Sequence, residues 1–517
     1  MSHSGKWRAG GWRAPLLAAV LGVSSALALP PFHVLPLLPV AICGLLALLG
    51  AQRGWRGAAR IGFCFGFGHH LLGLYWITDA IMLEAARFWW LVPVAVPLLA
   101  AALAAFVAAT CALARLARPG WPRAVTLAGG WVLADLLRSV AFTGFPWNPL
   151  GSVWALPGAA GDVLLQPAAL LGVHGLTLAT VLLCATPLLG RRAWLAGAAA
   201  LLAWGGFGLW RLDRATEPNL PLSVVVAQGD IAEGQKWDRT RAVASFEAYL
   251  DLTREGAAAA RAATPGVPVV VVWPETASPF LLDADARARA AIAEAVGSGG
   301  TVLAGSIRFD ARQQPRNSLM AMRTAGPPLA VYDKWHLVPF GEYQPSWARV
   351  GVQLVQGDGL TPGPGPRTLH VAGLPPFGAL ICYEAIFPAW IVDEADRPDW
   401  LVNITNDAWF GDSSGPRQHL AAARMRAVEE GLPLFRAANT GISADFDAFG
   451  RELGRLPIGA KGVLLRPLPG RLPPTLASRL GLLGPGLAAL AMALLGICHG
   501  QGVPRLLRQK AKVSQES

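Results

Sequence analysis

Apolar residues form long uninterrupted runs in the first 210 residues, and one more such run lies near the C-terminus. Crossing the hydrocarbon core of a membrane as a helix takes about 20 predominantly apolar residues. The runs predict eight membrane spans: Pro15–Leu29, Phe32–Leu49, Ile61–Trp76, Trp89–Leu113, Val125–Leu137, Val163–Leu189, Ala193–Trp210 and Leu480–Cys498. The sixth run contains Pro167 and His174, so we expect part of it to be irregular.

The first run also fits a signal peptide, because Lys6, Arg8 and Arg13 precede it. It lacks a clean small-residue cleavage site followed by a polar mature start, and the second run begins almost at once. These two observations favour a membrane span.

Residues 220–468 have a different pattern, in which short β-rich runs alternate with alanine-rich stretches. Apart from Pro268, Val267–Trp273 is a valine run, as expected for a strand that is covered on both faces. The other predicted strands are Leu222–Ala227, Thr301–Phe309, Asn317–Arg323, Gly378–Cys382 and Trp400–Ile404, and the predicted helices are Ala242–Ala263 and Ala284–Val296. This alternation predicts a layered α/β sandwich.

The domain organisation follows from these two patterns. We expect a membrane α-helical bundle of about seven spans in residues 1–215 and an α/β domain in residues 216–472. The eighth span follows in residues 473–500, and a basic tail in residues 501–517.

Composition supports the membrane interpretation, since 53% of the 517 residues are hydrophobic and only 15% are charged. Basic residues cluster in alternate loops between the predicted spans: Arg53, Arg56, Arg60, Arg115, Arg118, Arg123, Arg191, Arg192 and, after the last span, Arg505, Arg508, Lys510 and Lys512. Basic loops face the cytoplasm. Both termini are therefore predicted to be cytoplasmic and the α/β domain to lie outside the cytoplasm.

The net charge of +11 comes largely from these loops, so topology explains it. The chain has no recognisable nucleic-acid-binding motif, and we predict no nucleic-acid partner.

Cys382 stands apart from the other cysteines, because it alone lies in the α/β region, at the end of a predicted strand. The others are Cys43, Cys64, Cys111, Cys184 and Cys498, all in apolar runs. A lone thiol is either a small buried hydrophobic group or a nucleophile.

Two further motifs in the region supply partners for a nucleophilic thiol: Trp273-Pro-Glu275-Thr, and Tyr332-Asp-Lys334-Trp-His-Leu-Val-Pro-Phe-Gly-Glu342. A carboxylate takes the proton from a thiol, and an ammonium favours the thiolate and stabilises an oxyanion. The backbone N–H of Tyr383 is the natural second donor to that oxyanion. Glu275, Lys334 and Cys382 therefore predict two-step acyl transfer through a thioester.

These motifs, in this order, resemble the nitrilase superfamily, whose catalytic Glu, Lys and Cys correspond to Glu275, Lys334 and Cys382. The resemblance continues through residues 403–411 and 436–441. A nitrilase-like αββα sandwich placed before a final membrane span resembles the apolipoprotein N-acyltransferase family, and so do residues 228–237 and 336–342.

The resemblance implies a reaction in the bacterial inner membrane, with the catalytic domain on the periplasmic side and no cofactor. Cys382 would take an acyl chain from a phospholipid, usually phosphatidylethanolamine, and pass it to the α-amine of a diacylglyceryl-cysteine on a lipoprotein. Glu342 would support the lysine or the intermediate, Tyr383 and Glu384 would shape the site, and Trp237 would contact lipid or gate entry. We expect a monomer.

Two alternatives remain open from the residues. A membrane-tethered amidase would use the same thioester with water as the acceptor. A transporter or receptor would bind a ligand with a degenerate nitrilase-like domain, although an intact Glu-Lys-Cys set argues against it.

The histidines give no metal site. His336 and His419 are not at metal-ligand spacing with any cysteine pair, so we predict no metal. His69 and His70 lie in the third predicted span, where polar residues are candidates for function.

Overall fold

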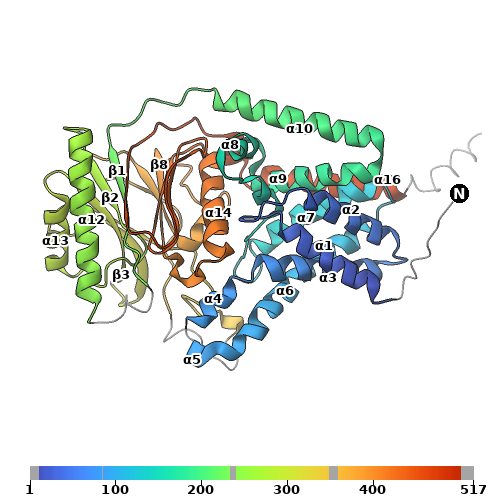
Figure 1. Cartoon of the computed structure of the whole chain (residues 1–517), viewed down its shortest axis with the longest axis horizontal. Coiled ribbons are helices and arrows are strands. Elements are labelled where there is room, and N and C mark those ends of the chain that lie inside the picture. The colour runs from blue at the N-terminus through green and yellow to red at the C-terminus, as the bar shows by residue number, and fades with distance from the viewer. Residues whose placement is uncertain (1–10, 84, 233–239, 349–358, 502–517) are drawn as a thin grey trace, which may run out of the picture. The chain divides into compact units, whose positions relative to one another are not determined.

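The computed structural model describes residues 11–83, 85–232, 240–348 and 359–501. The chain divides into two compact units (Figure 1). The helical unit comprises residues 1–156, 170–209 and 480–517, and the α/β unit comprises residues 157–169 and 210–479.

The helical unit contains most of the predicted spans as separate helices: α1 (Arg13–Ala26), α2 (Leu37–Gly50), α3 (Trp55–Gly73), α4 (Ile77–Met82), α5 (Ala85–Phe88), α6 (Val92–Ala114), α7 (Trp121–Arg138), α9 (Ala168–Ala185), α10 (Arg191–Leu212) and α16 (Leu483–Gln501). Among the described residues, three helical segments are long and apolar enough to cross a membrane: Trp89–Ala114, Ala168–Leu189 and Arg191–Leu212. Three more apolar helices are shorter: Arg13–Ala26, Leu37–Gly50 and Leu483–His499. The count of eight spans stays a prediction.

The predicted sixth span, Val163–Leu189, is not one continuous helix. Helix α8 (Gly158–Leu165) ends before Pro167, and α9 contains Gly172 with φ 61° and ψ 172°, which is not a helical conformation. A proline cannot donate the backbone hydrogen bond that a helix interior requires. The irregularity expected from Pro167 is therefore present.

Glycines allow the helices of this unit to pack closely. A Cβ atom at Gly22 of α1 would lie 1.9 Å from the carbonyl oxygen of Phe65 on α3. A Cβ atom at Gly129 of α7 would lie 2.3 Å from the carbonyl oxygen of Ala489 on α16. Small residues at helix contacts are typical of membrane bundles, where close van der Waals packing holds helices together.

Two of the basic loops lie side by side within the helical unit. Arg115, just after α6, donates from Nε to the carbonyl oxygen of Gln52, just after α2, at 3.1 Å. The loops of the opposite set also meet, because Asn148 donates from Nδ2 to the carbonyl oxygen of Gly73 at 3.2 Å. The basic α2–α3 and α6–α7 loops therefore share one end of the unit.

The α/β unit contains two six-stranded sheets, with strand orders β12-β1-β2-β3-β4-β5 and β11-β10-β9-β8-β7-β6. The first sheet is made of β1 (Ser223–Gln228), β2 (Val269–Val272), β3 (Thr301–Phe309), β4 (Pro315–Met322), β5 (Ala330–Asp333) and β12 (Gly462–Pro467). The second is made of β6 (Thr368–Leu369), β7 (Phe377–Ile381), β8 (Trp400–Thr405), β9 (Leu434–Ala438), β10 (Ser443–Phe446) and β11 (Glu452–Leu456).

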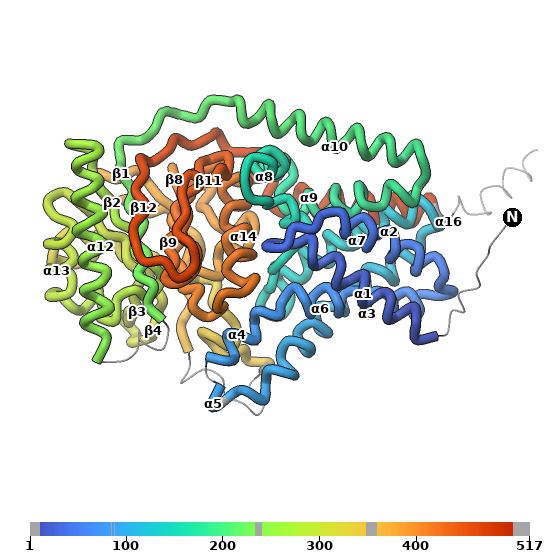
Figure 2. Tube along the Cα trace, in the orientation of Figure 1, coloured from blue at the N-terminus to red at the C-terminus, as the bar shows by residue number. Residues whose placement is uncertain are grey.

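The two sheets have the same internal plan. β1, β2 and β3 pair in parallel, as do β7, β8 and β9, and antiparallel strands flank both sets. Parallel strands place their carboxyl ends at one edge of a sheet, which is where functional residues gather in α/β folds. Figure 2 shows the last strand, β12, returning beside the first, β1.

Alternating residues of the strands form two different cores. Val270 and Val272 pack with Phe377 and Ile381 in the core between the sheets. Val271 points the other way and belongs to the outer core, beneath helix α12. Burying each such side chain contributes about 1.5–3 kcal/mol relative to leaving it exposed. The valine run is covered on both faces, as predicted.

Helices cover both outer faces and complete the four layers of the sandwich (Figure 1). Helices α12 (Ala242–Ala263) and α13 (Ala286–Val296) pack on the first sheet, and α14 (Ser414–Glu430) packs on the second. Helix α14 begins where the Ser413 hydroxyl accepts from the N–H of Gly415, and it ends at Gly431 with φ 69°. Ser is a preferred N-cap and Gly a preferred C-terminal cap.

Residues 157–169 pack with the α/β unit, although the sequence pattern grouped them with the helical region. Asp162 forms an ion pair of 2.6 Å with Arg424 on α14, and Gln166 donates to the carbonyl oxygen of Phe449 at 3.0 Å. Polar contacts, which hydropathy does not register, thus bind this segment to the α/β unit.

Candidate active site

The three residues predicted to carry chemistry each follow the end of a strand. Glu275 comes shortly after β2, Lys334 directly after β5, and Cys382 directly after β7. The first two strands belong to one sheet and the third to the other. All three side chains are buried, with Lys334 only 1% exposed.

Glu275, Lys334 and Glu342 form one hydrogen-bonded cluster. The ammonium nitrogen Nζ of Lys334 lies 3.1 Å from Oε1 of Glu275 and 2.9 Å from Oε1 of Glu342. Asn317 on β4 donates from Nδ2 to the same two oxygens, at 2.7 and 3.0 Å. One cation and one amide thus hold two carboxylates together.

The backbone fixes the far side of both carboxylates. The N–H of Asn406 donates to Oε2 of Glu275 at 2.9 Å, and the N–H of Val338 donates to Oε2 of Glu342 at 2.7 Å. Each carboxylate is therefore locked in orientation before any substrate arrives, which is the condition for efficient catalysis by preorganised groups.

The charges of the cluster act on the groups around it. Burial alone would lower the pKa of Lys334, but the carboxylates of Glu275 and Glu342 raise that pKa well above its ordinary value. Burial and the negative charge of Glu275 raise the pKa of the Cys382 thiol, although Lys334 and a hydrogen bond with Thr405 act in the opposite direction. The lysine is therefore an ammonium and the resting cysteine a neutral thiol.

Cys382 has an unusual backbone. Its φ is 50°, in the left-handed region that L-residues other than Asn and Asp rarely adopt. Such a residue costs about 1–3 kcal/mol and persists only where its surroundings hold it. The sequence predicted Cys382 as the last residue of a strand, but the strand ends at Ile381 and Cys382 begins the 3-10 turn Cys382–Ile386.

Glu384 holds this turn against the lysine loop. Its Oε2 accepts from the N–H of Ile381 at 2.7 Å, and its Oε1 accepts from the N–H of Trp335 at 2.8 Å. The Tyr332 hydroxyl donates to both oxygens at 3.1 Å. Burial raises the pKa of Glu384 to about 7 despite these donors.

Tyr383 and Trp237 are the other two residues predicted to belong to the site. Tyr383 is 5% exposed and its ring packs edge-on to Phe387, at 5.1 Å between ring centroids. Trp237 lies outside the described residues.

Sequence reasoning missed several polar residues beneath the site. Asn317 and Asn406 bind the catalytic carboxylate candidate Glu275, and Asp407, His419 and Arg436 form a fully buried network next to Cys382. Asn406, Asp407 and Arg436 fall within the segments that carried the family resemblance, so the signal was present. Asn317 lies near the start of β4, and nothing in its local sequence marks it.

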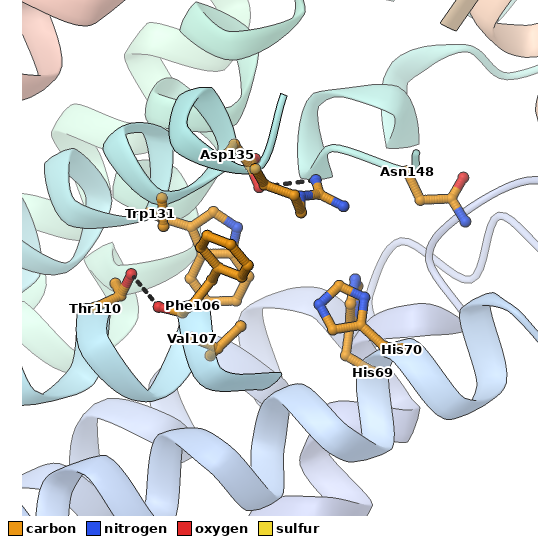
Figure 3. Close-up of a pocket in the computed structure, with 10 residues that line it drawn as sticks. His69, His70, Phe106, Val107, Thr110, Trp131, Asp135 and Asn148 are labelled. Carbon is orange, nitrogen blue, oxygen red and sulfur yellow. Dashed lines mark hydrogen bonds and ion pairs between the residues drawn. The ribbon is translucent and has the colours of Figure 1, made fainter. Parts of the chain in front are cut away.

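The helical unit has a second polar cluster, which lines a small recess (Figure 3). His69 and His70 come from α3, Asp135 and Arg138 from α7, and Asn148 from the segment after α7. Arg138 lies 2.9 Å from Asp135, and Ser25 is 2.8 Å from Nδ1 of His69. The recess offers a volume of about 10 Å³, enough for about one water molecule.

Two family sequence models match the chain, one for each type of unit. The family described as "Apolipoprotein N-acyltransferase N-terminal domain" matches residues 21–186. The family described as "Carbon-nitrogen hydrolase" matches residues 224–471.

Whole-chain relatives carry the same name. A protein of Rhodopseudomonas palustris named apolipoprotein N-acyltransferase is 39% identical over 524 aligned positions, which cover 95% of this chain and 96% of the relative. A protein of Brucella suis with that name is 40% identical over 488 positions, covering 89% and 90%. A solved carbon-nitrogen hydrolase from Helicobacter pylori aligns at 17% identity and a TM-score of 0.35, covering 47% of this chain and 87% of that one. The two sequence relatives match both the helical and the α/β residues of the chain.

Proposed function

This chain belongs to the apolipoprotein N-acyltransferase family, and from that premise we propose that it acylates lipoprotein N-termini through a thioester on Cys382. The acyl chain comes from a membrane phospholipid and goes to the α-amine of a diacylglyceryl-cysteine. Phosphatidylethanolamine as the donor and a monomeric enzyme are carried over from the family resemblance.

The cluster of Glu275, Lys334 and Glu342 is the observation that carries the mechanism. The raised pKa of Cys382 leaves little free thiolate, so attack on the ester requires a base that acts as the bond forms. Glu275 has this role, because its negative charge acts on the thiol and its orientation is fixed by Lys334 and Asn406. Glu342 keeps the lysine charged and in place.

In the first half-reaction the sulfur bonds to the ester carbonyl carbon, Glu275 takes the thiol proton, and the carbonyl oxygen becomes an oxyanion. Lys334 and the N–H of Tyr383 stabilise this oxyanion. The carbon–oxygen bond of the ester then breaks, and the departing lysophospholipid takes the proton from Glu275. The thioacyl enzyme remains.

In the second half-reaction the lipoprotein amine attacks the thioester. An amide bond forms, the carbon–sulfur bond breaks, and the proton released by the amine returns to the sulfur through Glu275. The triacylated lipoprotein leaves and the resting thiol is restored. Tyr383 and Glu384 shape the nucleophile turn, and Trp237 contacts lipid or gates entry.

We place the reaction in the bacterial inner membrane with the α/β unit on the periplasmic side and eight helical spans. The contact between Arg115 and Gln52 supports this topology, because it gathers two basic loops at one end of the helical unit. Basic loops belong on the cytoplasmic side. An impermeant protease on intact spheroplasts should cleave the α/β unit and spare the tail after Arg505; cleavage of the tail alone would invert the orientation.

Mass spectrometry tests the thioester directly. Purified protein incubated with phosphatidylethanolamine should gain one acyl chain on the peptide that contains Cys382, and neutral hydroxylamine should remove it. Cys382→Ala should gain none, whereas Cys498→Ala, which changes an exposed cysteine of α16, should behave as wild type. Absence of the adduct in the wild type would contradict the proposal.

The same preparation distinguishes transfer from hydrolysis. Addition of a diacylated lipopeptide should remove the acyl chain from Cys382, and the lipopeptide should gain that chain. If the adduct decays equally fast with and without the lipopeptide and free fatty acid accumulates, the protein is a membrane-tethered amidase-type hydrolase.

A further inference from the structure

A histidine that the mechanism does not use lies directly behind the nucleophile. His419, on α14, is completely buried, and its Nε2 lies 2.9 Å from the backbone carbonyl oxygen of Cys382. A carbonyl oxygen only accepts hydrogen bonds, so Nε2 is protonated and is the hydrogen-bond donor in this contact.

The second ring nitrogen of His419, Nδ1, is also held by polar neighbours. Nδ1 of His419 lies 3.0 Å from Oδ1 of Asp407 and 3.2 Å from Nη2 of Arg436. Arg436 also pairs with Oδ2 of Asp407 at 2.6 Å, and the Thr405 hydroxyl donates to Oδ1 at 2.9 Å. Although burial opposes ionisation, Arg436 and His419 hold the pKa of Asp407 at about 2. The imidazole ring therefore has a fixed position.

The bonded carbonyl belongs to the peptide group that joins Cys382 to Tyr383. A trans peptide is planar, and its C=O and N–H point in opposite directions. A donor that fixes the carbonyl of Cys382 therefore also fixes the direction of the N–H of Tyr383. The fixing is needed here, because Cys382 has a φ of 50° and its own backbone preference favours other conformations.

We propose that His419 is a positioning residue for the oxyanion hole: by binding the Cys382 carbonyl it aims the Tyr383 N–H at the oxyanion of the tetrahedral intermediate. This rests on the proposed thioester mechanism. His419 exchanges no proton with substrate; its donated hydrogen bond polarises the peptide group and makes the N–H of Tyr383 a stronger donor.

Geometry rules out the other common roles of a histidine next to a cysteine. In a cysteine–histidine pair, a ring nitrogen bonds the sulfur and takes its proton. Here Nε2 bonds the carbonyl oxygen and Nδ1 faces Asp407 and Arg436.

The test compares two reactions of the same sulfur in the full-length protein. Acylation passes through an oxyanion, whereas alkylation by iodoacetamide does not. His419→Ala should slow single-turnover acylation of Cys382 by about a hundredfold, the range seen when one oxyanion donor is lost. It should change the alkylation rate less than about threefold and leave the KM for the acyl donor nearly unchanged. His419→Gln, whose amide N–H reaches the same carbonyl, should recover at least about tenfold of the lost rate.

His370→Ala is the matched control, because His370 belongs to the same unit but is exposed and pairs with Asp396. Wild-type acylation by His419→Ala would overturn the proposal. Equal slowing of acylation and alkylation would also overturn it, since His419 would then act on the thiol or on folding, and thermal unfolding curves identify the second case.

Failure of the proposed function has a different signature. p-Nitrophenyl butyrate, a generic acyl ester, reports on the oxyanion hole without any phospholipid. If phosphatidylethanolamine fails to acylate wild-type protein but the ester succeeds and His419→Ala slows it, the donor assignment is wrong and the role of His419 stands. If the ester acylates both proteins equally, the role of His419 is wrong.

Discussion

Each unit contains a buried cluster of charged side chains, and these two clusters balance charge differently. In the α/β unit, one ammonium (Lys334) is paired with two carboxylates (Glu275 and Glu342). In the helical unit, one guanidinium (Arg138) is paired with one carboxylate (Asp135), at 2.9 Å. The first set keeps a carboxylate in excess that can take a proton, whereas the second set is balanced.

The difference in charge balance suits one cluster to proton transfer and the other to stabilising the fold. A base must be able to change its protonation state during the reaction, and the proposed mechanism gives that role to Glu275, whose charge acts on the Cys382 thiol. A balanced buried pair loses stability when one partner is removed, because the other charge stays buried without compensation. Substitutions in the two clusters should therefore differ in effect: in the first they should slow acylation, and in the second they should lower stability.

The largest effect is expected from Glu275→Gln. The amide keeps the size of the side chain and can still accept from the N–H of Asn406, but it cannot take the thiol proton. Acylation of Cys382 should fall about a thousandfold, or about 4 kcal/mol in the barrier, within the range for a general base. Glu294→Gln, on the exposed face of α13, is the control. A loss below tenfold would mean that another group takes the proton.

Removal of one partner from the balanced pair should affect folding instead. Arg138→Met leaves Asp135 buried and charged, which should cost about 3 kcal/mol of unfolding free energy. The double variant Asp135→Leu/Arg138→Met should recover about half of that loss, because the carbonyl of Trp147 still lacks its donor. Thermal unfolding in detergent measures both. The comparison breaks down if Arg138→Met slows acylation per folded molecule as much as Glu275→Gln does.

Glu342→Gln sharpens the comparison by balancing the charge of the α/β cluster. Lys334 would keep a single carboxylate partner, Glu275, which would then be held more strongly as an anion and become a weaker base. We expect acylation to slow about thirtyfold, or about 2 kcal/mol, with little loss of stability. Single-turnover acylation is the measurement, and Glu294→Gln is again the control. An unchanged rate would show that the excess charge does not matter.

The effect that is smallest per pH unit concerns Glu384. Burial raises its pKa from an ordinary 4.5 to about 7 in the folded protein. The folded state thus binds the proton more tightly, so its contribution to stability is complete below pH 4.5 and is lost as pH rises through 7. The slope in this window should reach about 1.4 kcal/mol per pH unit. Unfolding curves should show it in the wild type and not in Glu384→Gln; equal slopes in both proteins would contradict the assignment.

The central strands and two helices of the α/β unit were predictable because their local sequences are typical of these elements: valine-rich runs for strands and alanine-rich stretches for helices. Thr301–Phe309 and Ala242–Ala263 were predicted with the bounds that the structure gives them. The prediction missed β5 and β12 of the first sheet and β6, β9, β10 and β11 of the second. Strand β9 contains Arg436, which looks polar in sequence but is fully buried on Asp407 and Asn403. A long-range ion pair of this kind leaves no local signal.

The candidate site shows the same limit. Each motif predicted a functional residue at the end of a strand. The structure brings Glu275, Lys334 and Glu342 into contact. The left-handed backbone of Cys382 could not be predicted, because cysteine has no preference for it and the contacts that hold it come from α14 and from the lysine loop. The sequence pattern relates His419 only to metal binding, and its proposed role depends on a backbone atom that no sequence motif reveals.

The two ends of the α/β sandwich, near residues 217 and 471, meet at one seam. The N–H of Leu220 donates to the carbonyl of Leu468 at 3.0 Å, and the N–H of Glu217 donates to the carbonyl of Arg471 at 3.1 Å. A folded unit whose two ends touch can be spliced into a longer polypeptide without disturbing its sheets. One insertion point between α10 and α16 is thus enough to connect the sandwich to the helices that precede and follow it.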